Sequence, residues 1–213
     1  MDSLGDALAL FRHLDEHLVW LVQTYGRWSY AILFLVIFCE TGLVVTPFLP
    51  GDSLLFAAGA VAAVGSFDLT SLCALLVVAA VAGDAANYSI GRTLTVRWAR
   101  RSRLVKQEYL ERAELFYRTH GGKAIVIARF APFLRTFVPF VAGAARMPYR
   151  RFGFFNVVGG LTWVVLFSSA GYLFGRVPFV ERNFTAVVLG IIILSLLPAT
   201  LGAWNGRRRG ATR

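Results

Sequence analysis

Residues Phe38 to Gly59 constrain the fold most, because they interrupt an apolar run with charges and helix breakers. The interruptions are Glu40, Pro47, Pro50, Gly51 and Asp52. A carboxylate at membrane depth is costly unless it faces protein, water or a counter-charge. Prolines leave backbone groups without helical partners, and lipid cannot satisfy them. The stretch therefore predicts a helical hairpin that dips into a membrane, with its broken tip lining a polar cavity.

The composition indicates an integral membrane protein. Apolar residues make up 57% of the 213 residues and charged residues 16%, whereas soluble proteins average about 45–50% and about 25%. The formal net charge is +10. Because the arginines flank apolar runs, this charge indicates cytoplasmic loops and anionic lipid head groups, not nucleic acid.

The two hairpins that we expect are each followed by one membrane crossing. The first has limbs at 31–46 and 54–64, and the crossing at 69–90 carries Asp84 on a polar face with Asn87 and Tyr88. Its second limb of 11 residues would cover only about 16 Å, roughly half the hydrocarbon core. The second broken segment, 124–145, carries Arg129, Pro132, Arg135 and Pro139, and a crossing at 152–175 follows it.

Matching residues at a nearly constant offset indicate an internal repeat. Pro47-Phe48-Leu49 recurs 85 positions later at Pro132-Phe133-Leu134, and Ala58-Gly59 recurs 84 positions later at Ala142-Gly143. Tyr88-x-x-Gly91-Arg92 recurs 84 positions later at Tyr172-x-x-Gly175-Arg176. A single crossing separates the hairpins, so the second unit should be inverted relative to the first. Paired broken helices in inverted repeats are typical of secondary transporters.

The predicted fold is an all-α integral membrane protein built on an inverted repeat of two re-entrant hairpins, each followed by a transmembrane helix. Amphipathic interfacial helices and a C-terminal transmembrane helix complete it. The expected parts are an N-terminal amphipathic interfacial helix at 1–28, a membrane domain at 29–183, and a C-terminal transmembrane helix with a basic cytoplasmic tail at 184–213. The membrane domain divides into repeat 1 at about 30–92, a basic cytoplasmic helix at about 93–121 and repeat 2 at about 122–176.

Three sequence blocks resemble the DedA family, the bacterial relatives of SNARE-associated VTT-domain proteins. They are Glu40-Thr-Gly through Pro50-Gly-Asp-Ser-Leu-Leu-Phe, Gly83-Asp84-x-x-x-Tyr88-x-x-Gly91-Arg92, and Arg129-Phe-x-Pro-x-x-Arg135-Thr-Phe-x-Pro with Ala142-Gly143. The resemblance covers about residues 28–176. It implies a bacterial cytoplasmic-membrane protein that returns undecaprenyl phosphate or phosphatidylethanolamine to the cytoplasmic leaflet, dependent on the proton gradient. It also implies an essential acidic pair at Glu40 and Asp52, and an essential arginine pair at Arg129 and Arg135.

The leading functional hypothesis is a proton-coupled transporter, flippase- or scramblase-like, for a phosphate-bearing lipid. Glu40, Asp52 and Asp84 are the candidate proton-coupling residues, and Arg129, Arg135 and Thr136 are the candidate phosphate-binding residues. An arginine fork pairs a phosphate bidentately. We expect Glu40 and Asp52, when charged, to hold the two arginines and, on protonation, to release them to the lipid. Lipids and protons are the expected partners.

Two other classes remain open: a proton-coupled antiporter for small ions or drugs that uses the same residues, and a structural membrane-assembly factor, which leaves the embedded charges unexplained. Glu40, Asp52, Arg129 and Arg135 could also form a fixed buried ion-pair cluster that holds the hairpins together. An enzyme is not expected, because none of the three histidines has a nucleophile and partner arrangement around it. Cys39 and Cys73 lie in apolar runs without metal-ligand spacing. We therefore expect no catalytic residues, no metal and no cofactor. The C-terminus should be cytoplasmic, because three arginines occupy 207–209.

Overall fold

The structure, a computed structural model, describes residues 28–43, 51–65, 67–93 and 107–177, with Val187 and Gly190. The α-helices in these ranges are α3 (Trp28–Gly42), α4 (Gly51–Ala63), α5 (Leu69–Thr93), α7 (Gln107–His120), α8 (Lys123–Ala128), α9 (Pro132–Ala144) and α10 (Tyr149–Phe174). The all-α prediction is confirmed for this part of the chain, which contains no strand. Helices were also expected at 1–28 and 184–213, but nearly all residues of these two ranges lie outside the described part of the chain.

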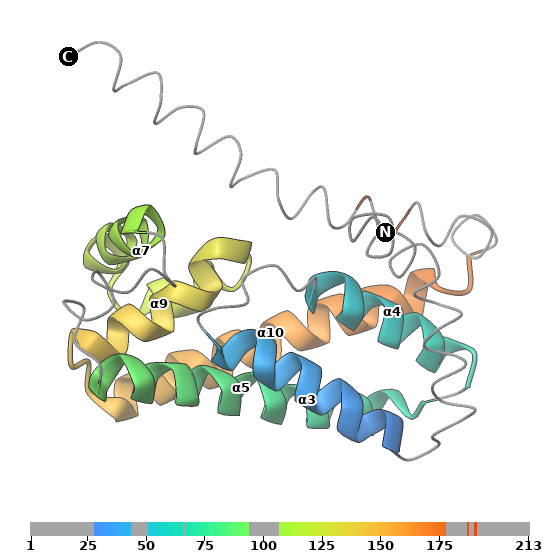
Figure 1. The fold of residues 1–213 in the computed structure, drawn as a ribbon. Helices are drawn as coiled ribbons and strands as arrows, with labels where there is room; N and C mark the ends of the chain where they lie inside the picture. The colour runs from blue at the N-terminus through green and yellow to red at the C-terminus, as the bar shows by residue number, and fades with distance from the viewer. Residues whose placement is uncertain are drawn as a thin grey trace, which may run out of the picture.

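Two helices are long and apolar enough to cross a membrane, α5 with 25 residues and α10 with 26. At 1.5 Å per residue each is about 38 Å long, more than the hydrocarbon thickness of a bilayer. They pack against one another and run in opposite directions (Figure 1). Only 33% of the most apolar window of each helix is buried inside the protein, which leaves apolar surface for lipid.

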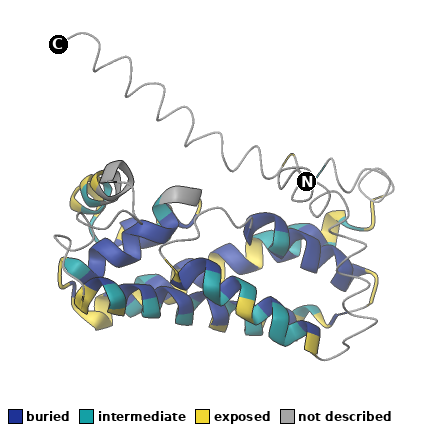
Figure 2. Ribbon diagram, in the orientation of Figure 1, coloured by how far each residue is buried: buried dark blue, intermediate teal, exposed yellow. Residues whose placement is uncertain are grey.

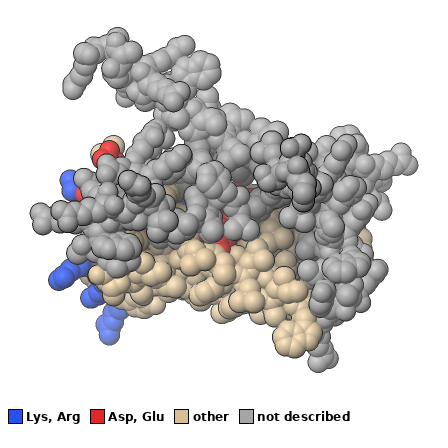
Figure 3. Space-filling view, in the orientation of Figure 1, with Lys and Arg blue, Asp and Glu red and all other residues tan. Residues whose placement is uncertain are grey.

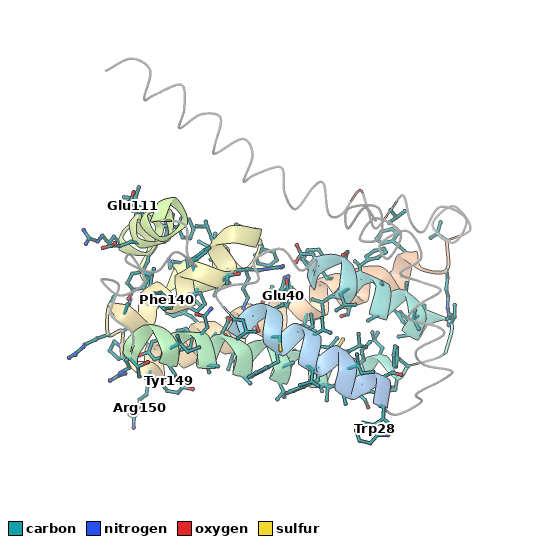
Figure 4. The ribbon with its side chains drawn as sticks, in the orientation of Figure 1. Trp28, Glu40, Glu111, Phe140, Tyr149 and Arg150 are labelled. Atoms are coloured by element: carbon teal, nitrogen blue, oxygen red, sulfur yellow. The ribbon has the colours of Figure 1, made fainter. Side chains whose placement is uncertain are left out.

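The short helices occupy the two ends of this antiparallel pair. Helix α3 runs from Trp28 at one end to Glu40 in the middle of the molecule, and α4 runs back toward the same end (Figures 1 and 4). Helices α7 and α9 lie toward the opposite end (Figure 1). The helical limits differ from the prediction, because α3 ends at Gly42 and α4 already begins at Gly51. The early start of α4 has a local cause: the backbone N–H of Gly51 donates to Glu40 Oε1 at 3.1 Å.

Helices α4 and α9 each pack on the long helix that belongs to the other of the two predicted repeats. Helix α3 packs on α5 of its own unit, but α4 packs on α10 and α9 packs on α5. Both exchanged contacts rest on a glycine. A Cβ on Gly59 would lie 2.1 Å from the carbonyl oxygen of Ser168, and a Cβ on Gly143 would lie 2.0 Å from that of Tyr88. The Ala-Gly match found in the sequence therefore marks two equivalent helix crossings.

The buried apolar side chains form two clusters, one toward each end of the molecule. One apolar cluster joins α3, α4, α5 and α10 around Ile37, Leu55 and Leu76, and a second joins the other end around Ile125, Val138 and Phe152. In Figure 2 the buried residues line the inward sides of these helices. In the described surface of Figure 3, basic side chains gather at the end of the molecule where α5 ends and α10 begins, and uncharged side chains cover most of the remainder, with a small acidic patch visible in the middle.

The predicted breaks at prolines have different outcomes. Pro132 is the first residue of α9, where its missing N–H costs nothing. Pro139, however, lies inside α9, and the helix continues to Ala144, so the prediction of a break there is wrong. Pro139 removes only the intrahelical hydrogen bond that the Arg135 carbonyl would otherwise accept. Pro47 and Pro50 lie outside the described residues.

Asp68 caps the N-terminus of α5, and this contact predicts a pH effect on stability. Its Oδ2 atom accepts from the backbone N–H of Ser71 at 2.7 Å. This N–H, with the Ser71 hydroxyl, holds the pKa of the Asp68 carboxyl below its usual range. A depressed folded-state pKa contributes stability above the unfolded value of about 3.9 and loses it as the pH falls through the folded value.

Asp68→Asn should therefore reduce the acid-induced loss of stability. An asparagine retains the cap but does not titrate. Thermal unfolding of wild type and variant between about pH 6 and pH 3 measures the difference. Identical pH curves for the two proteins would contradict an ionised cap.

Candidate functional site

Arg135 joins the ends of three helices. It lies in the first turn of α9, donates through Nη1 to Asp52 Oδ1 at 2.7 Å, and donates through Nη2 to Glu40 Oε1. Asp52 lies in the first turn of α4 and Glu40 in the last turn of α3. All three side chains are buried. The structure therefore brings Glu40, Asp52 and Arg135 together in the middle of the molecule, where Figure 4 labels Glu40.

Gly51 is required by this geometry. Its N–H donates to Glu40 Oε1, and a Cβ added to it would lie 2.0 Å from Glu40 Oε2. The glycine predicted as part of the hairpin break thus lets the carboxylate approach the N-terminus of α4, where the helix dipole favours negative charge. Glu40 Oε2 is buried and has no hydrogen-bond partner among the described residues.

Arg129 has a different partner from the one expected. It follows the last turn of α8 and donates through Nη2 to Asp84 Oδ2 at 2.6 Å. The same Nη2 atom donates to Asn156 Oδ1 at 2.8 Å. The expectation that Glu40 and Asp52 hold both arginines is therefore wrong for Arg129. The polar face predicted on α5 supplies its carboxylate.

Trp163 and Asn156, both on α10, belong to the cluster and were not anticipated. The indole N–H of Trp163 donates to Asp52 Oδ1 at 2.8 Å. Its ring centroid lies 5.3 Å from the Arg135 guanidinium carbon and 5.8 Å from that of Arg129, within cation–π range. Asn156 donates through Nδ2 to the carbonyl of Val81 at 2.9 Å, which fixes its amide between α5 and α10.

Asn87 joins α3 to α9 beside the charges. Its Nδ2 atom donates to the carbonyl of Thr41 on α3 at 3.2 Å and to that of Thr136 on α9 at 2.7 Å. Thr136, a candidate phosphate ligand, is buried, and its described contact with Asn87 is through the backbone. The three residues predicted to share a polar face of α5 are buried: Asp84, Asn87 and Tyr88.

Among the residues that the structure describes, the charges of the cluster do not balance. The described residues bring together three buried carboxylates and two buried guanidiniums. They are Glu40, Asp52 and Asp84, with Arg129 and Arg135. An uncompensated charge away from water is expensive. With every group ionised, the cluster has one negative charge in excess, so neutrality requires one more positive charge.

Comparison with protein families identifies relatives of the chain. Residues 49–173 match the model of the VTT domain. The chain is 48% identical over 215 residues to Protein DedA of Escherichia coli K12, covering 99% of this chain and 98% of the relative. It is 43% identical to the uncharacterized membrane protein ML0287 of Mycobacterium leprae, covering 81% and 78%. It is also 36% identical to the inner membrane protein YghB of Escherichia coli K12, covering 91% and 89%.

No solved structure matches the chain. The relatives are named as membrane or inner membrane proteins of bacteria. Together with two helices of spanning length, they identify a bacterial inner membrane protein. The chain belongs to the DedA family of VTT-domain membrane proteins.

Proposed function

We propose that the protein is a transporter, not an enzyme, that moves a phosphate-bearing lipid such as undecaprenyl phosphate or a phospholipid across the bacterial cytoplasmic membrane. One observation carries the proposal. Two buried guanidiniums, on Arg129 and Arg135, donate to buried carboxylates, and Arg129 also donates to the Asn156 amide oxygen. Two oxygens of a phosphate can accept the paired hydrogen bonds of a planar guanidinium, as a carboxylate does, so the two anions can exchange.

The helix arrangement supports transport rather than static packing. The ends that face the cluster belong to short helices, α3, α4, α8 and α9, which we propose enter and leave the membrane from one side each. Substrate sites of inverted-repeat transporters lie where such broken elements meet. A hairpin tip can separate from its partner while α5 and α10 remain across the bilayer.

The charge imbalance supports coupling to protons. Counted over the described residues, the cluster carries one excess negative charge, which a proton on a carboxylate would neutralise. A protonated carboxyl no longer competes for an arginine as an anion, so proton uptake would release a guanidinium to the lipid phosphate. Loss of the proton on the other side would restore the ion pair and expel the phosphate.

The basic end of the molecule supports a cytoplasmic orientation for that end. Exposed arginines there include Arg92, Arg146 and Arg150, and positive residues accumulate on the cytoplasmic side of membrane proteins. We propose that this end and the C-terminus are cytoplasmic. The hairpin of α8 and α9 would then open toward the cytoplasm, and that of α3 and α4 toward the outside.

Arg135→Lys tests the proposal. The lysine keeps the charge but replaces two forked donors with one ammonium, so the variant should fold and accumulate while transport falls at least about tenfold. Purified protein in liposomes containing labelled polyprenyl phosphate measures leaflet movement, with and without a pH gradient. Normal transport by the variant would contradict bidentate phosphate pairing. No movement by the wild type would contradict lipid transport.

A further inference from the structure

The two arginines of the cluster are neutralised to different extents. Arg135 donates to the carboxylates of both Glu40 and Asp52, whereas Arg129 donates to a single carboxylate, that of Asp84. Within the described residues, both hydrogen bonds of Arg129 come from Nη2. Its Nε atom is buried and has no hydrogen-bond partner there. One edge of this guanidinium therefore lacks the acceptor that a buried donor requires.

Helix α10 forms a fitted surface for Arg129. A Cβ on Gly159 would lie 3.1 Å from Arg129 Cδ and 3.2 Å from Nε, and a Cβ on Gly160 would lie 3.5 Å from Nη2. The two glycines thus allow the arginine to lie directly against the helix backbone. Asn156, one turn earlier on α10, accepts from Nη2 at 2.8 Å and is itself fixed by the Val81 carbonyl.

We propose that Arg129 is the receiving subsite for the oxyanion of a phosphate ester and that Asn156 is its positioning residue. The proposal rests on the proposed transport of a phosphate-bearing lipid. An oxyanion that approaches Arg129 competes with one carboxylate, but at Arg135 it competes with two. Asn156 holds Nη2 through a neutral oxygen, so it orients the guanidinium without adding a competing charge. Arg135 receives the phosphate second, after Glu40 or Asp52 has released it.

Trp163 provides a reporter for this order, because its ring contacts both guanidiniums. In a full-length chain with its other tryptophans changed to phenylalanine, Trp163 is the only indole. The residues to change are Trp20, Trp28, Trp98 and Trp204. The probe is hexyl phosphate, a soluble alkyl phosphate, titrated into this protein in phosphatidylcholine nanodiscs. A parallel titration with inorganic phosphate distinguishes a lipid-type ester from free phosphate.

The decisive comparison is between two substitutions at Asn156. Both Asn156→Asp and Asn156→Ala lose the amide hydrogen bond to Val81, but only the aspartate adds a second carboxylate beside Arg129. We expect Asn156→Ala, which removes the orienting contact, to raise the Kd for hexyl phosphate about threefold, and Asn156→Asp, which adds a competing carboxylate, to raise it at least about thirtyfold. Equal effects of the two variants would overturn the role of Asn156, because a structural role alone predicts them.

A glycine pair tests the same subsite without changing any charge. Gly159→Ala should displace Arg129 by a few tenths of an ångström and raise the Kd for hexyl phosphate. Gly153→Ala, on the same helix with no atom within 4 Å of the added Cβ, should leave the Kd unchanged. Equal Kd values for these two variants would overturn the proposal, and this pair decides the matter if an Asn156 variant fails to fold.

The outcomes separate the subsite from transport itself. Arg135→Lys should still bind hexyl phosphate while losing lipid movement in liposomes. If wild-type protein moves lipid phosphate but Arg135→Lys abolishes probe binding, the order of the two arginines is wrong and transport stands. If no lipid moves while Trp163 reports saturable binding that Asn156→Asp abolishes, the subsite stands and transport is wrong.

The titrations of wild-type protein test the subsite directly. No saturable fluorescence response to hexyl phosphate overturns the subsite, and an equal response to inorganic phosphate overturns its preference for an ester.

Discussion

Arg135→Met is expected to lower the free energy of unfolding by about 3–5 kcal/mol, the typical cost of removing one partner from a buried ion pair. Arg135 donates to both Glu40 and Asp52, and all three side chains are buried. Methionine would leave two carboxylates without the guanidinium that neutralises them. Since proteins are commonly stable by only about 5–15 kcal/mol, purified protein should unfold at a clearly lower temperature.

Neutral replacements of the carboxylates should restore folding but not transport. In the background of Glu40→Gln and Asp52→Asn, Arg135→Met leaves no unpaired charge at this position, so most of the stability should return. Lipid movement in liposomes should remain absent, because the phosphate ligand is gone. Recovery of transport together with folding would favour a purely structural cluster and contradict a phosphate site.

Arg118→Met provides the matched control for the loss of an arginine. Arg118 donates to Glu114 at 2.7 Å on the surface of α7, and 74% of its side chain is exposed. Exposed pairs contribute about 0–1 kcal/mol, so this variant should unfold near the wild-type temperature. If Arg118→Met and Arg135→Met destabilise equally, burial of the ion pair is not what determines the cost.

Gly59→Ala and Gly143→Ala are each expected to destabilise the protein by at least about 1–3 kcal/mol, the usual cost of overpacking a close contact. The added Cβ would lie 2.1 Å from a carbonyl oxygen of α10 in the first case and 2.0 Å from one of α5 in the second. The obstacles are backbone atoms of long helices, which cannot rotate away as a side chain can. The crossing helices must therefore separate.

Gly153→Ala controls for the change from glycine to alanine within a helix. Nothing lies within 4 Å of its added Cβ, and alanine favours a helix over glycine by about 1 kcal/mol. Thermal unfolding should therefore show Gly153→Ala at or above the wild-type temperature and the other two variants below it. If all three behave alike, the close crossings do not limit stability.

The charged residues could be predicted from the sequence because each interrupts an apolar run. That reasoning identified Glu40, Asp52, Asp84, Arg129 and Arg135, and the structure brings all of them into one cluster. It did not identify their pairing, because hydropathy shows which side chains are buried but not which helix faces which. The assignment of Arg129 to Asp84 depends on the packing of α9 on α5 and of α8 on α10.

Two residues of α10 that belong to the cluster were not predicted from the sequence, for different reasons. Asn156 is an amide within an apolar helix, so the reasoning applied to Glu40 could have found it. Trp163 carries no such signal, because a tryptophan in an apolar run suits lipid or core equally well, and only its indole N–H requires a partner. The start of α4 at Gly51 could not be predicted either, because it depends on a hydrogen bond that the Gly51 N–H donates to a side chain eleven positions earlier.

The exchange of packing partners has a consequence for biogenesis. Helix α4 ends at Ala63, but its main partner α10 begins only at Tyr149. During synthesis α4 is therefore made long before α10, the helix that buries it. Asp52 has neither Arg135 nor Trp163 as a partner until those residues have been made. Both apolar clusters of the described residues include side chains of α10, Trp163 in one and Phe152 in the other, so neither is complete until α10 has been made.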